Sequence, residues 1–449
     1  MISKKFCCLL PISIWVLLIY IAGNLIKKAR NLLAGVSLPA KTGDRLLNEA
    51  TGPLRDITII DCTMALAGPF GTSLLADLGA NVIKVEPPQG DMARSGAPLP
   101  PDFANPTAPE KAGVNYGGYF ASINRNKRSI VLDFKAEGDR EKFLHLCEQA
   151  DAVVENMRAG VMDKLGVGYE VIAGRNPKIV YGCIRGFGDP RTGASPYSEW
   201  PAYDAVAQAM SGLAHITGPE AEDGYPCGVS VGDIFPGTLM ALGVVSAVHN
   251  ARRTGQGQFM DIAMYDAMLS FCETVIVNYG YPEQRQLNAR GRHHPNLMPF
   301  GLYPTSDGSI AIAAPGPKHW EILCHAMGRN DLIEDERSKN TYVRRKNQIF
   351  LEAQIAAWTS SKSKAEIVAI LGGKVPCGPV NNAEDIYNDP HVTAREMITR
   401  FQLPGENPEV AIVGTPFKFT ETQAGFYRLP PNLGEHSEEI LDEFNIPRE

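Results

Sequence analysis

The stretch DITIIDCTMALAGPFGTSLLADLGANVIKVEPP, residues 56–88, decides the fold that this sequence predicts. Residues 57–62 and 81–86 are short apolar runs with the composition of buried strands. Between them, residues 66–71 are typical of a turn, and residues 71–79 carry apolar side chains at helical spacing. A strand, a helix and a second strand within about 30 residues are typical of a βαβ unit, in which the two strands run parallel.

Two further apolar runs continue this alternation along the chain. Residues 151–156 follow an amphipathic segment at 140–150, and residues 178–188 form the next run. Buried strands that alternate with helices predict an α/β fold with an open, parallel, Rossmann-like sheet covered on both faces. Ligands of such sheets lie at the carboxyl ends of the strands. We predict those ends at Thr63–Pro69, Glu86–Pro88, Asn156–Arg158 and Arg185–Gly188.

The first unit also invites comparison with a nicotinamide-binding unit, because Glu86 ends the second strand where a ribose-binding acid would stand. However, residues 63–71 read TMALAGPFG, which is not the G-x-G-x-x-G pattern. Pro69 also lacks the backbone N–H that could bind a diphosphate at a helix start. The sequence therefore argues against a nicotinamide cofactor.

The overall composition argues against some partners and against a metal site. The chain has 449 residues, 44% of them apolar and 21% charged, which is long enough for two domains with their own cores. Its formal net charge of −7 argues against nucleic acid as a partner, because phosphate binding needs a basic surface. Its nine cysteines form no CxxC pair and no Cys/His set with zinc spacing. We therefore expect reduced, mostly buried thiols and no metal site.

The N-terminal segment differs from the rest of the chain. Residues 6–26 are 21 residues without a charge, and basic residues flank them on both sides. This length suffices to cross a hydrocarbon core of about 30 Å, and no small-residue cleavage site follows. We expect a single-span membrane anchor within residues 1–30, a linker at 31–52 and a cytoplasmic catalytic part. The alternatives are an organelle-targeting sequence, with the protein in the cytoplasm or mitochondrion, or a segment that the mature protein lacks.

A change of composition near residues 290–315 predicts a second domain. The stretch is rich in histidine, proline and glycine, unlike the helical pattern before it. We expect a large domain over residues 53–285 and a smaller α+β domain over residues 286–385. Residues 386–449 are then expected to return to the large domain.

One carboxylate stands out in GVSVGDIFPGTLMALGVVSAVHNA, residues 228–251, because Asp233 lies directly before a long apolar helical pattern. By physical chemistry alone the favoured interpretation is a helix N-cap, since aspartate is a preferred capping residue. His293 and His294 are interpreted as solvent-facing or structural, because no third ligand stands at zinc spacing. The sequence contains no G-x-S-x-G elbow, P-loop or H-E-x-x-H motif, so common serine and metal mechanisms have no support.

Eight stretches of the chain, in the same order, resemble the class III CoA-transferase family, which includes formyl-CoA, carnitine and succinyl-CoA transferases. The resemblance covers about residues 52–445, and its strength lies in the number and order of the stretches. These are LAGPFGTSLLADLGANVIKVEPPQGD (66–91), NRNKRSIVLDFK (124–135), VVENMRAGVMDKLG (153–166), YDAVAQAMSGLAHITG (203–218), GVSVGDIFPG (228–237), RRTGQGQFMDIAMYDAML (252–269), HPNLMPFGLYPTSDG (294–308) and LGEHSEEIL (433–441).

The resemblance implies both a fold and a mechanism. It implies an interlocked homodimer, in which each subunit has a large domain built from N- and C-terminal parts and a smaller α+β domain. Asp233 matches the family's aspartate nucleophile in a Gly-Asp motif, and Gly232 beside it is expected to free backbone N–H groups for an oxyanion. The substrates implied are an acyl-CoA and a carboxylic acid, with no permanently bound cofactor, because exchange of CoA between two acids conserves one thioester. An ionised carboxylate needs no general base, which agrees with the missing serine triad.

The resemblance also implies contacts to CoA and to the acyl group. The basic residues among them are expected to neutralise CoA phosphates. The matching positions are Ala67, Leu132, Asp133, Phe134, Lys135, Asn156, Met157, Arg158, Lys164, Ala202 and Tyr203. The chain departs from the family at Met64 and Leu66, where many relatives have basic or polar residues, and at Pro87, where many have arginine. We expect these CoA contacts to be altered.

Two other functions are compatible with the same fold. The α-methylacyl-CoA racemase of this family needs two bases on opposite faces of its substrate. This chain has Tyr203 where the racemase has histidine, and a tyrosine with a pKa near 10 is a poor base at neutral pH. An inactive, membrane-attached CoA-binding protein is the second alternative, which the retained Gly232 and Asp233 disfavour.

The acids that exchange CoA are indicated only by resemblance. Residues 203–218 look more like the dicarboxylate branch of the family than the carnitine branch. If the substrate has a distal carboxylate, the candidates to bind it are His215, Arg292 and His293, each of which has a structural interpretation as well.

Overall fold

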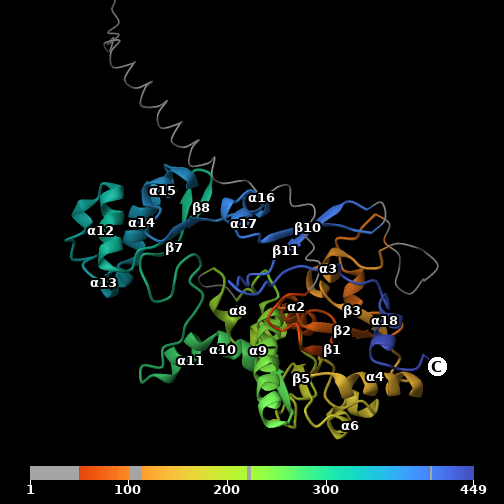
Figure 1. The fold of residues 1–449 in the computed structure, drawn as a ribbon. Coiled ribbons are helices and arrows are strands. Elements are labelled where there is room, and N and C mark those ends of the chain that lie inside the picture. Colours follow the sequence, from red (N-terminus) through yellow and green to blue (C-terminus); the bar gives the residue numbers. More distant parts are fainter. Residues whose placement is uncertain (1–49, 102, 104–113, 220–223, 405–406, 449) are drawn as a thin grey trace, which may run out of the picture. The chain divides into compact units, whose positions relative to one another are not determined.

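A six-stranded parallel sheet with the strand order β3-β2-β1-β4-β5-β6 is the largest sheet of the computed structural model (Figure 1). Its strands are β1 (Thr58–Cys62), β2 (Asn81–Glu86), β3 (Arg128–Val131), β4 (Ala152–Glu155), β5 (Val180–Arg185) and β6 (Gln258–Ala263). The parallel pairing of β1 with β2 and β4 confirms the predicted α/β fold. The structure describes residues 50–101, 103, 114–219, 224–404 and 407–448.

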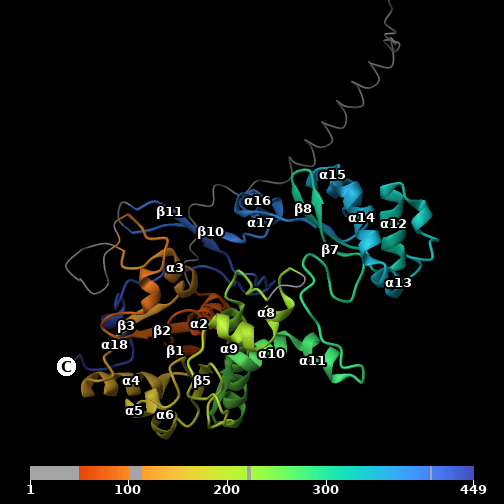
Figure 2. The same cartoon turned by 180° about the vertical axis from the view of Figure 1, so that it is seen from behind.

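Helices cover both faces of this sheet, because successive side chains of the central strands point to opposite sides. Ile59 and Val154 pack on one face with α2 and α9, whereas Ile60 and Val153 pack on the other face with α4, α6 and α18. Figures 1 and 2 show these helices around the sheet from the front and from behind. Their bounds are Ala67–Asp77 for α2, Glu137–Gln149 for α4, Tyr169–Arg175 for α6, Val231–Thr254 for α9 and Ser437–Glu443 for α18.

Helix α2 begins at Ala67, so the predicted turn at residues 66–71 is wrong for most of its length. Pro69 is the third residue of the helix, where its missing N–H breaks no helical hydrogen bond. Gly71 lies against Gly237 of α9: a Cβ on Gly71 would stand 2.4 Å from the Gly237 carbonyl oxygen. A Cβ on Gly237 would likewise stand 2.3 Å from the Ala67 carbonyl oxygen. This close crossing places the start of α9 beside the start of α2.

Within the described residues, α9 is long and apolar enough to cross a membrane by length and composition alone. Its side chains Met240, Val244 and Val248 are buried against the sheet, as expected for a core helix. The predicted anchor at residues 6–26 lies outside the described residues, as does nearly all of the linker. The anchor therefore stays a prediction.

A second, antiparallel sheet follows the large one along the chain. It packs with three helices around its own core, which includes Tyr303, Ile310 and Leu351. Its strands are β7 (Phe300–Thr305), β8 (Gly308–Ala313) and β9 (Cys377–Pro379), and the helices are α12 (Pro317–Met327), α14 (Gln348–Thr359) and α15 (Lys364–Leu371). This is the expected smaller α+β part, although its predicted boundaries stay untested.

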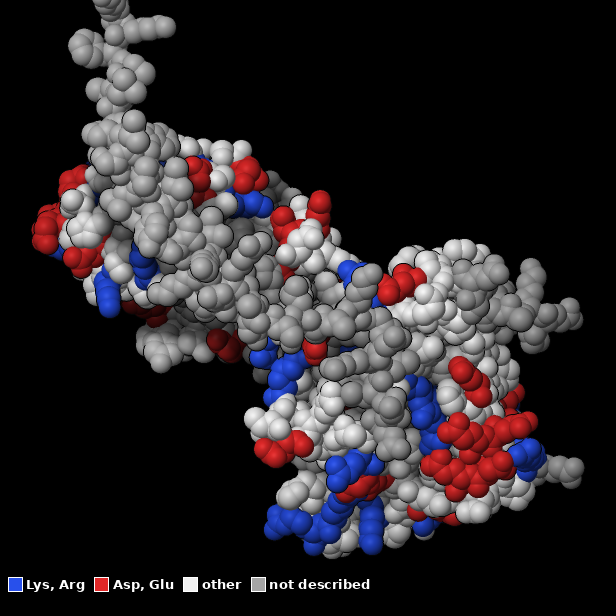
Figure 3. Space-filling model, turned by 45° about the horizontal axis from the view of Figure 1, so that its top comes forward, with Lys and Arg blue, Asp and Glu red and all other residues white. Residues whose placement is uncertain are grey.

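The C-terminal residues contact the large sheet again. Ile440 and Leu441 of α18 belong to the core on the α4 face, and the Arg128 guanidinium on β3 binds Glu439 at 2.8 Å. Before α18, the strands β10 (Ile398–Gln402) and β11 (Glu409–Val413) form an antiparallel pair. On the face drawn in Figure 3, acidic side chains gather in one patch at the lower right, with basic side chains beside it.

The described cysteines are free thiols, and most are buried, as expected. Burial raises the pKa of Cys62 and Cys147, so these thiols stay protonated and inert.

Candidate active site

A cavity of about 690 Å³ lies at the carboxyl ends of β1, β4 and β5. The chain passes from β1 to β2 on one side, whereas β4 pairs with β1 on the other side. Ligands of open parallel sheets bind at such a switch point. The walls include residues 64–67 after β1, 156–159 after β4 and 184–186 at the end of β5, with Ala202 and Asp233 beside them. The cavity thus lies where the strand pattern predicted a ligand.

The turn after β1 is held in a conformation that the sequence did not reveal. Ala65 has φ of 65°, in the left-handed region, and its N–H donates to Asp91 Oδ1 at 3.1 Å. The Met64 N–H donates to Asn156 Oδ1, and Asn156 Nδ2 donates back to the Met64 carbonyl, both at 2.8 Å. Asn156 therefore joins the turns after β1 and β4, which form two walls of the cavity.

Buried charges lie beneath this turn. Lys127 Nζ binds Asp61 at 2.9 Å, and Lys84 Nζ binds Asp91 at 2.9 Å, with all four side chains fully buried. Burial alone would raise the pKa of Asp61, but Lys127 and Lys84 hold it at about 2. Lys84 also donates to the Thr63 carbonyl at 2.8 Å. These ion pairs fix the strand ends that carry the turn.

Asp233 faces this cavity from the first turn of α9. The predicted N-cap role is wrong, because Ser230 precedes the helix and Asp233 is its third residue. The N–H groups of Asp233 and Ile234 both donate to the Ser230 carbonyl at 3.0 Å, which starts the helix earlier than the sequence suggested. Burial, with the nearby charge of Asp204, raises the pKa of Asp233 from 3.8 to about 6. Asp233 is thus a carboxylate with raised basicity in a ligand-sized cavity.

Gly232 was expected to free backbone N–H groups for an oxyanion, but in the structure its own N–H is already bound. Its N–H donates to Asp204 Oδ1 at 2.7 Å, so this group already has an acceptor. A Cβ on Gly232 would stand 2.8 Å from the Asp204 carbonyl oxygen. Here, glycine permits the close approach of Asp204 to the start of α9.

The cavity brings together most of the residues that were predicted to bind near the reacting group. Asp233 and six predicted contacts line it, whereas Gly232 lies beside it. The six are Ala67, Asn156, Met157, Arg158, Ala202 and Tyr203. Together with Asp233 they come from four separate segments of the sequence, which the fold joins at one edge of the sheet.

The other predicted CoA contacts do not line this cavity. Leu132 is buried, and Phe134 packs against the core. Asp133 and Lys135 lie in the turn before α4, where the Lys135 N–H donates to Asp133 Oδ1 at 3.0 Å. Lys164 ends the short helix α5, Val161–Lys164. Their contacts to CoA stay predictions.

The candidates for a distal carboxylate also lie outside the cavity lining. His215 Nε2 lies 3.1 Å from Asn288 Oδ1, and His293 Nε2 lies 3.3 Å from a Glu352 carboxylate oxygen. Burial lowers the pKa of His293. These contacts agree with the structural interpretation of both histidines, and Arg292 is not among the lining residues either.

Several large side chains line the cavity without having been predicted, namely Met92, Tyr119, Arg185, Trp200 and Met264. Only Arg185 had a signal in the sequence, because it stands at a predicted strand end. Its guanidinium binds Glu155 at 2.7 and 2.5 Å and also reaches the Met157 carbonyl. Arg185 therefore holds the segment after β4 in place.

Replacing Asp233 by asparagine is expected to stabilise the protein at neutral pH. The native pKa of about 6 exceeds the unfolded value of 3.8, so ionisation favours the unfolded chain. The free-energy cost of ionising Asp233 in the folded protein is absent below the pKa of the unfolded chain. It grows as the pH rises toward 6 and reaches at most about 3 kcal/mol. Because asparagine also loses the favourable charge at a helix start, we expect a net gain of about 2 kcal/mol at pH 7.

Urea unfolding of both proteins at pH 7 and pH 4 measures this difference. The gain should vanish by about pH 4, where Asp233 is protonated in the native state. An asparagine variant that is less stable than the parent at pH 7 would contradict the raised pKa.

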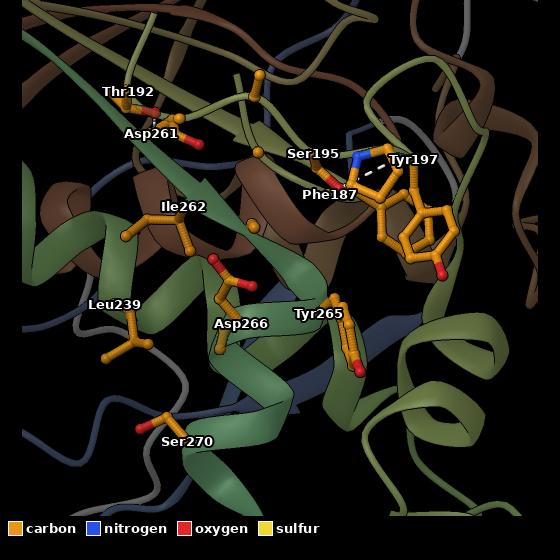
Figure 4. A pocket seen from close by; sticks show the side chains of 16 residues that line it. Phe187, Thr192, Ser195, Tyr197, Leu239, Asp261, Ile262, Tyr265, Asp266 and Ser270 are labelled. Carbon is orange, nitrogen blue, oxygen red and sulfur yellow. Dashed lines mark hydrogen bonds between the residues drawn. The ribbon is translucent and has the colours of Figure 1, made fainter. Parts of the chain in front are cut away.

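A second cavity, of about 740 Å³, lies near the end of β6 (Figure 4). The rings of Phe187, Tyr197 and Tyr265 line it, together with Asp266 from the first turn of α10, Met264–Phe271. None of the predicted site residues lines this second cavity. Asp266 occupies the third position of its helix, as Asp233 does in α9, which makes it a useful reference residue.

Comparisons with known proteins show which family this chain resembles. The model of CoA-transferase family III matches residues 54–437. The succinyl-CoA:mesaconate CoA-transferase of Haloarcula hispanica is 44% identical over 397 residues, covering 88% of this chain and 97% of that protein. The succinate–glutarate CoA-transferase of Agrobacterium fabrum is 35% identical over 400 residues, covering 87% and 95%. The crystal structure of a CAIB/BAIF family protein from Brucella suis matches with a TM-score of 0.75 and 32% identity, covering 88% of this chain and 100% of that one.

Proposed function

This chain belongs to CoA-transferase family III and is a CoA-transferase, and from this premise we propose that Asp233 is the covalent carrier of its reaction. The observation that supports the proposal best is the position of Asp233. Its carboxylate lines the cavity at the switch point of the sheet, opposite the segments after β1 and β4. With a pKa of about 6, it is mostly ionised at pH 7 and yet more basic than an ordinary aspartate.

The proposed reaction begins with the donor acyl-CoA. A carboxylate oxygen of Asp233 attacks the thioester carbon, the C–S bond breaks, and CoA leaves as a thiolate, which gives an aspartyl–acyl anhydride. The thiolate then attacks the side-chain carbonyl carbon of Asp233. The anhydride C–O bond breaks, and the donor acid leaves as a carboxylate, which gives an aspartyl–CoA thioester.

The second half repeats these steps in reverse order. The acceptor carboxylate attacks the aspartyl–CoA thioester, which releases the thiolate and forms a new anhydride. The thiolate attacks the acceptor carbonyl and restores the Asp233 carboxylate. No step requires a general base, because every nucleophile is already an anion. The positive end of the α9 dipole also favours the charged form of Asp233 at its first turn.

We propose dicarboxylic acids as the exchanging partners, with a dicarboxylyl-CoA such as succinyl-CoA as donor. The relatives compared above are named for succinyl-CoA, mesaconate, succinate and glutarate. Arg158 lines the cavity, and an arginine is the side chain best suited to bind a second carboxylate, whereas the Arg185 guanidinium is already paired with Glu155. The other basic positions matched to CoA-binding segments, Lys135 and Lys164, are proposed to meet the CoA phosphates.

Trapping the intermediate tests the role of Asp233. When the protein is incubated with succinyl-CoA and then hydroxylamine, we expect a hydroxamate on Asp233, because both proposed intermediates are activated acyl derivatives of that side chain. Peptide mass spectrometry locates the modification. The Asp266 peptide and a sample without acyl-CoA serve as controls and should stay unmodified. Turnover with an unmodified Asp233 peptide would rule out the covalent role.

The same preparation tests the substrate class. With succinyl-CoA as donor, mass spectrometry follows the new CoA esters formed from a panel of mono- and dicarboxylic acids. Monocarboxylic acids that accept CoA as fast as mesaconate or glutarate would contradict the dicarboxylate proposal while leaving the role of Asp233 intact.

We also propose that two copies form the interlocked homodimer that the family resemblance implies. The exposed faces of α9, α10 and the helix Glu273–Gly280 (α11) carry large apolar side chains that would be covered in a dimer. They are Leu242, Phe271, Ile276, Val277 and Tyr279. Sedimentation velocity of the purified protein distinguishes a dimer from a monomer.

A further inference from the structure

We propose that Asp204 is a positioning residue that fixes the first turn of α9 and thereby sets the geometry of Asp233, an inference that rests on the proposed role of Asp233. Asp204 is the first residue of α7, Asp204–Met210, and it does not line the cavity. It therefore acts on the reaction through another residue rather than by contact with substrate.

The contact between the two helix starts is direct. Asp204 Oδ1 accepts the Gly232 N–H at 2.7 Å, one residue before Asp233. That N–H belongs to the first turn of α9, where backbone donors have no helical acceptor. The Asp204 backbone comes equally close, since any Cβ on Gly232 would stand 2.8 Å from its carbonyl oxygen. Hydrogen bond and packing together leave the Gly232 backbone little room to move.

A buried glutamine continues this contact to the segment before α9. Gln208 is fully buried, and its Nε2 donates to both Asp204 carboxylate oxygens at 2.9 Å. Its Oε1 accepts the Cys227 N–H at 2.7 Å. The pair Asp204–Gln208 thus holds the backbone at two points, residues 227 and 232, on the segment that leads into Asp233. A polar pair with a fully buried member and its contacts satisfied on both sides specifies a single geometry.

Asp204 also acts by charge. Its carboxylate is the charged neighbour that, after burial, raises the pKa of Asp233. The other ionisable groups that line the cavity are Tyr119 of α3 (Gly118–Asn124), Tyr203 directly before α7, and Arg158 and Arg185 at the ends of β4 and β5. The pKa of Tyr119 is raised by burial and by Asp233, so it stays neutral near pH 7. Asp204 is therefore the anion that keeps Asp233 basic.

Two variants separate hydrogen bonding from charge. Asp204→Ala removes both. In the double variant Asp204→Asn/Gln208→Glu, the new amide oxygen accepts the Gly232 N–H, and the new amide nitrogen donates to the new carboxylate. The second oxygen of that carboxylate accepts the Cys227 N–H. The swap keeps an acceptor for the Gly232 N–H, an acceptor for the Cys227 N–H and one hydrogen bond between the two side chains, and it moves the negative charge one helical turn away from Gly232.

We expect Asp204→Ala to lower kcat by about 100-fold, because small displacements of a reacting group cost about this much. The KM for the donor should change less than about 3-fold, since Asp204 does not line the cavity. The swap should bring kcat back to within about 10-fold of the parent. The acid limb of the kcat/KM profile, which reports the free enzyme and lies near pH 6 in the parent, should move to lower pH in Asp204→Ala.

For the parent and each variant, hydroxylamine trapping at Asp233 is measured together with the kinetics. Thermal unfolding checks that each variant is folded. An Asp204→Ala variant with the parent's kcat and acid limb would overturn the inference. So would a folded swap variant as slow as Asp204→Ala, because it would show that acceptors for the Gly232 and Cys227 N–H groups do not restore the rate. If the parent itself shows no adduct on Asp233 during turnover, the proposed function fails together with this inference. If the adduct forms normally and only the Asp204 effects are missing, this inference fails alone.

Discussion

The Asp233→Ala variant is expected to lose CoA transfer by roughly 10⁴-fold or more in kcat, as removal of a nucleophile does in other enzymes with covalent intermediates. Without the carboxylate no anhydride forms, and the cavity offers no second carboxylate to replace it among its lining residues. Asp204 does not line the cavity, and its carboxylate is occupied by Gly232 and Gln208. The measurement is the rate of exchange between succinyl-CoA and a dicarboxylic acid, followed by mass spectrometry.

Asp266→Ala is the matched control. Both aspartates are third residues of apolar helices, but Asp266 is exposed and lines the other cavity. We expect its kcat to stay within about 3-fold of the parent. The comparison therefore separates a loss of chemistry from a loss of charge at a helix start. Exchange that persists in Asp233→Ala at more than about a tenth of the parent rate would remove Asp233 from the mechanism.

The stretch at residues 56–88 was sufficient to predict the centre of the fold, because β1 and β2 are buried on both faces and are mostly apolar despite the buried charges of Asp61 and Lys84. The edge strands were harder to find. β3 begins with Arg128 and Ser129, and β6 contains Gln258 and Asp261, so neither has an apolar run. Their pairing depends on neighbours far away in sequence, which no local pattern reports.

The candidate site was predictable in part. The switch point followed from the order of strands, and Asp233 was identified by resemblance, whereas local physics placed it at an N-cap. That error has a tertiary cause, since α9 starts at Val231 with Gly232 held by Asp204, 28 residues earlier. Met64 and Asn156 form two hydrogen bonds across 92 residues of sequence, and neither local segment predicts this pairing.

Lys127→Met is expected to lower the free energy of unfolding by about 3–5 kcal/mol, because it removes one partner of a fully buried ion pair. Lys127 Nζ also donates to Thr72, Asn124 and the Pro69 carbonyl, so the substitution leaves several buried acceptors without a donor. Urea unfolding at pH 7 measures the loss.

The matched control is Lys142→Met, the same substitution in a partly exposed pair with Asp139 at 3.2 Å. Such pairs contribute about 0–1 kcal/mol, so the control should be nearly neutral. A Lys127→Met variant that also loses less than about 1 kcal/mol would contradict the buried ion pair.

Acid titration gives an independent check on this pair. The native pKa of Asp61 is about 2, below its unfolded value of 3.8. Asp61 therefore stabilises the fold above the unfolded pKa, and this contribution disappears as the pH falls through the native one. In Lys127→Met the cation that contributes most to this low pKa is gone, so the stability of the variant should depend less on pH between about 4 and 2.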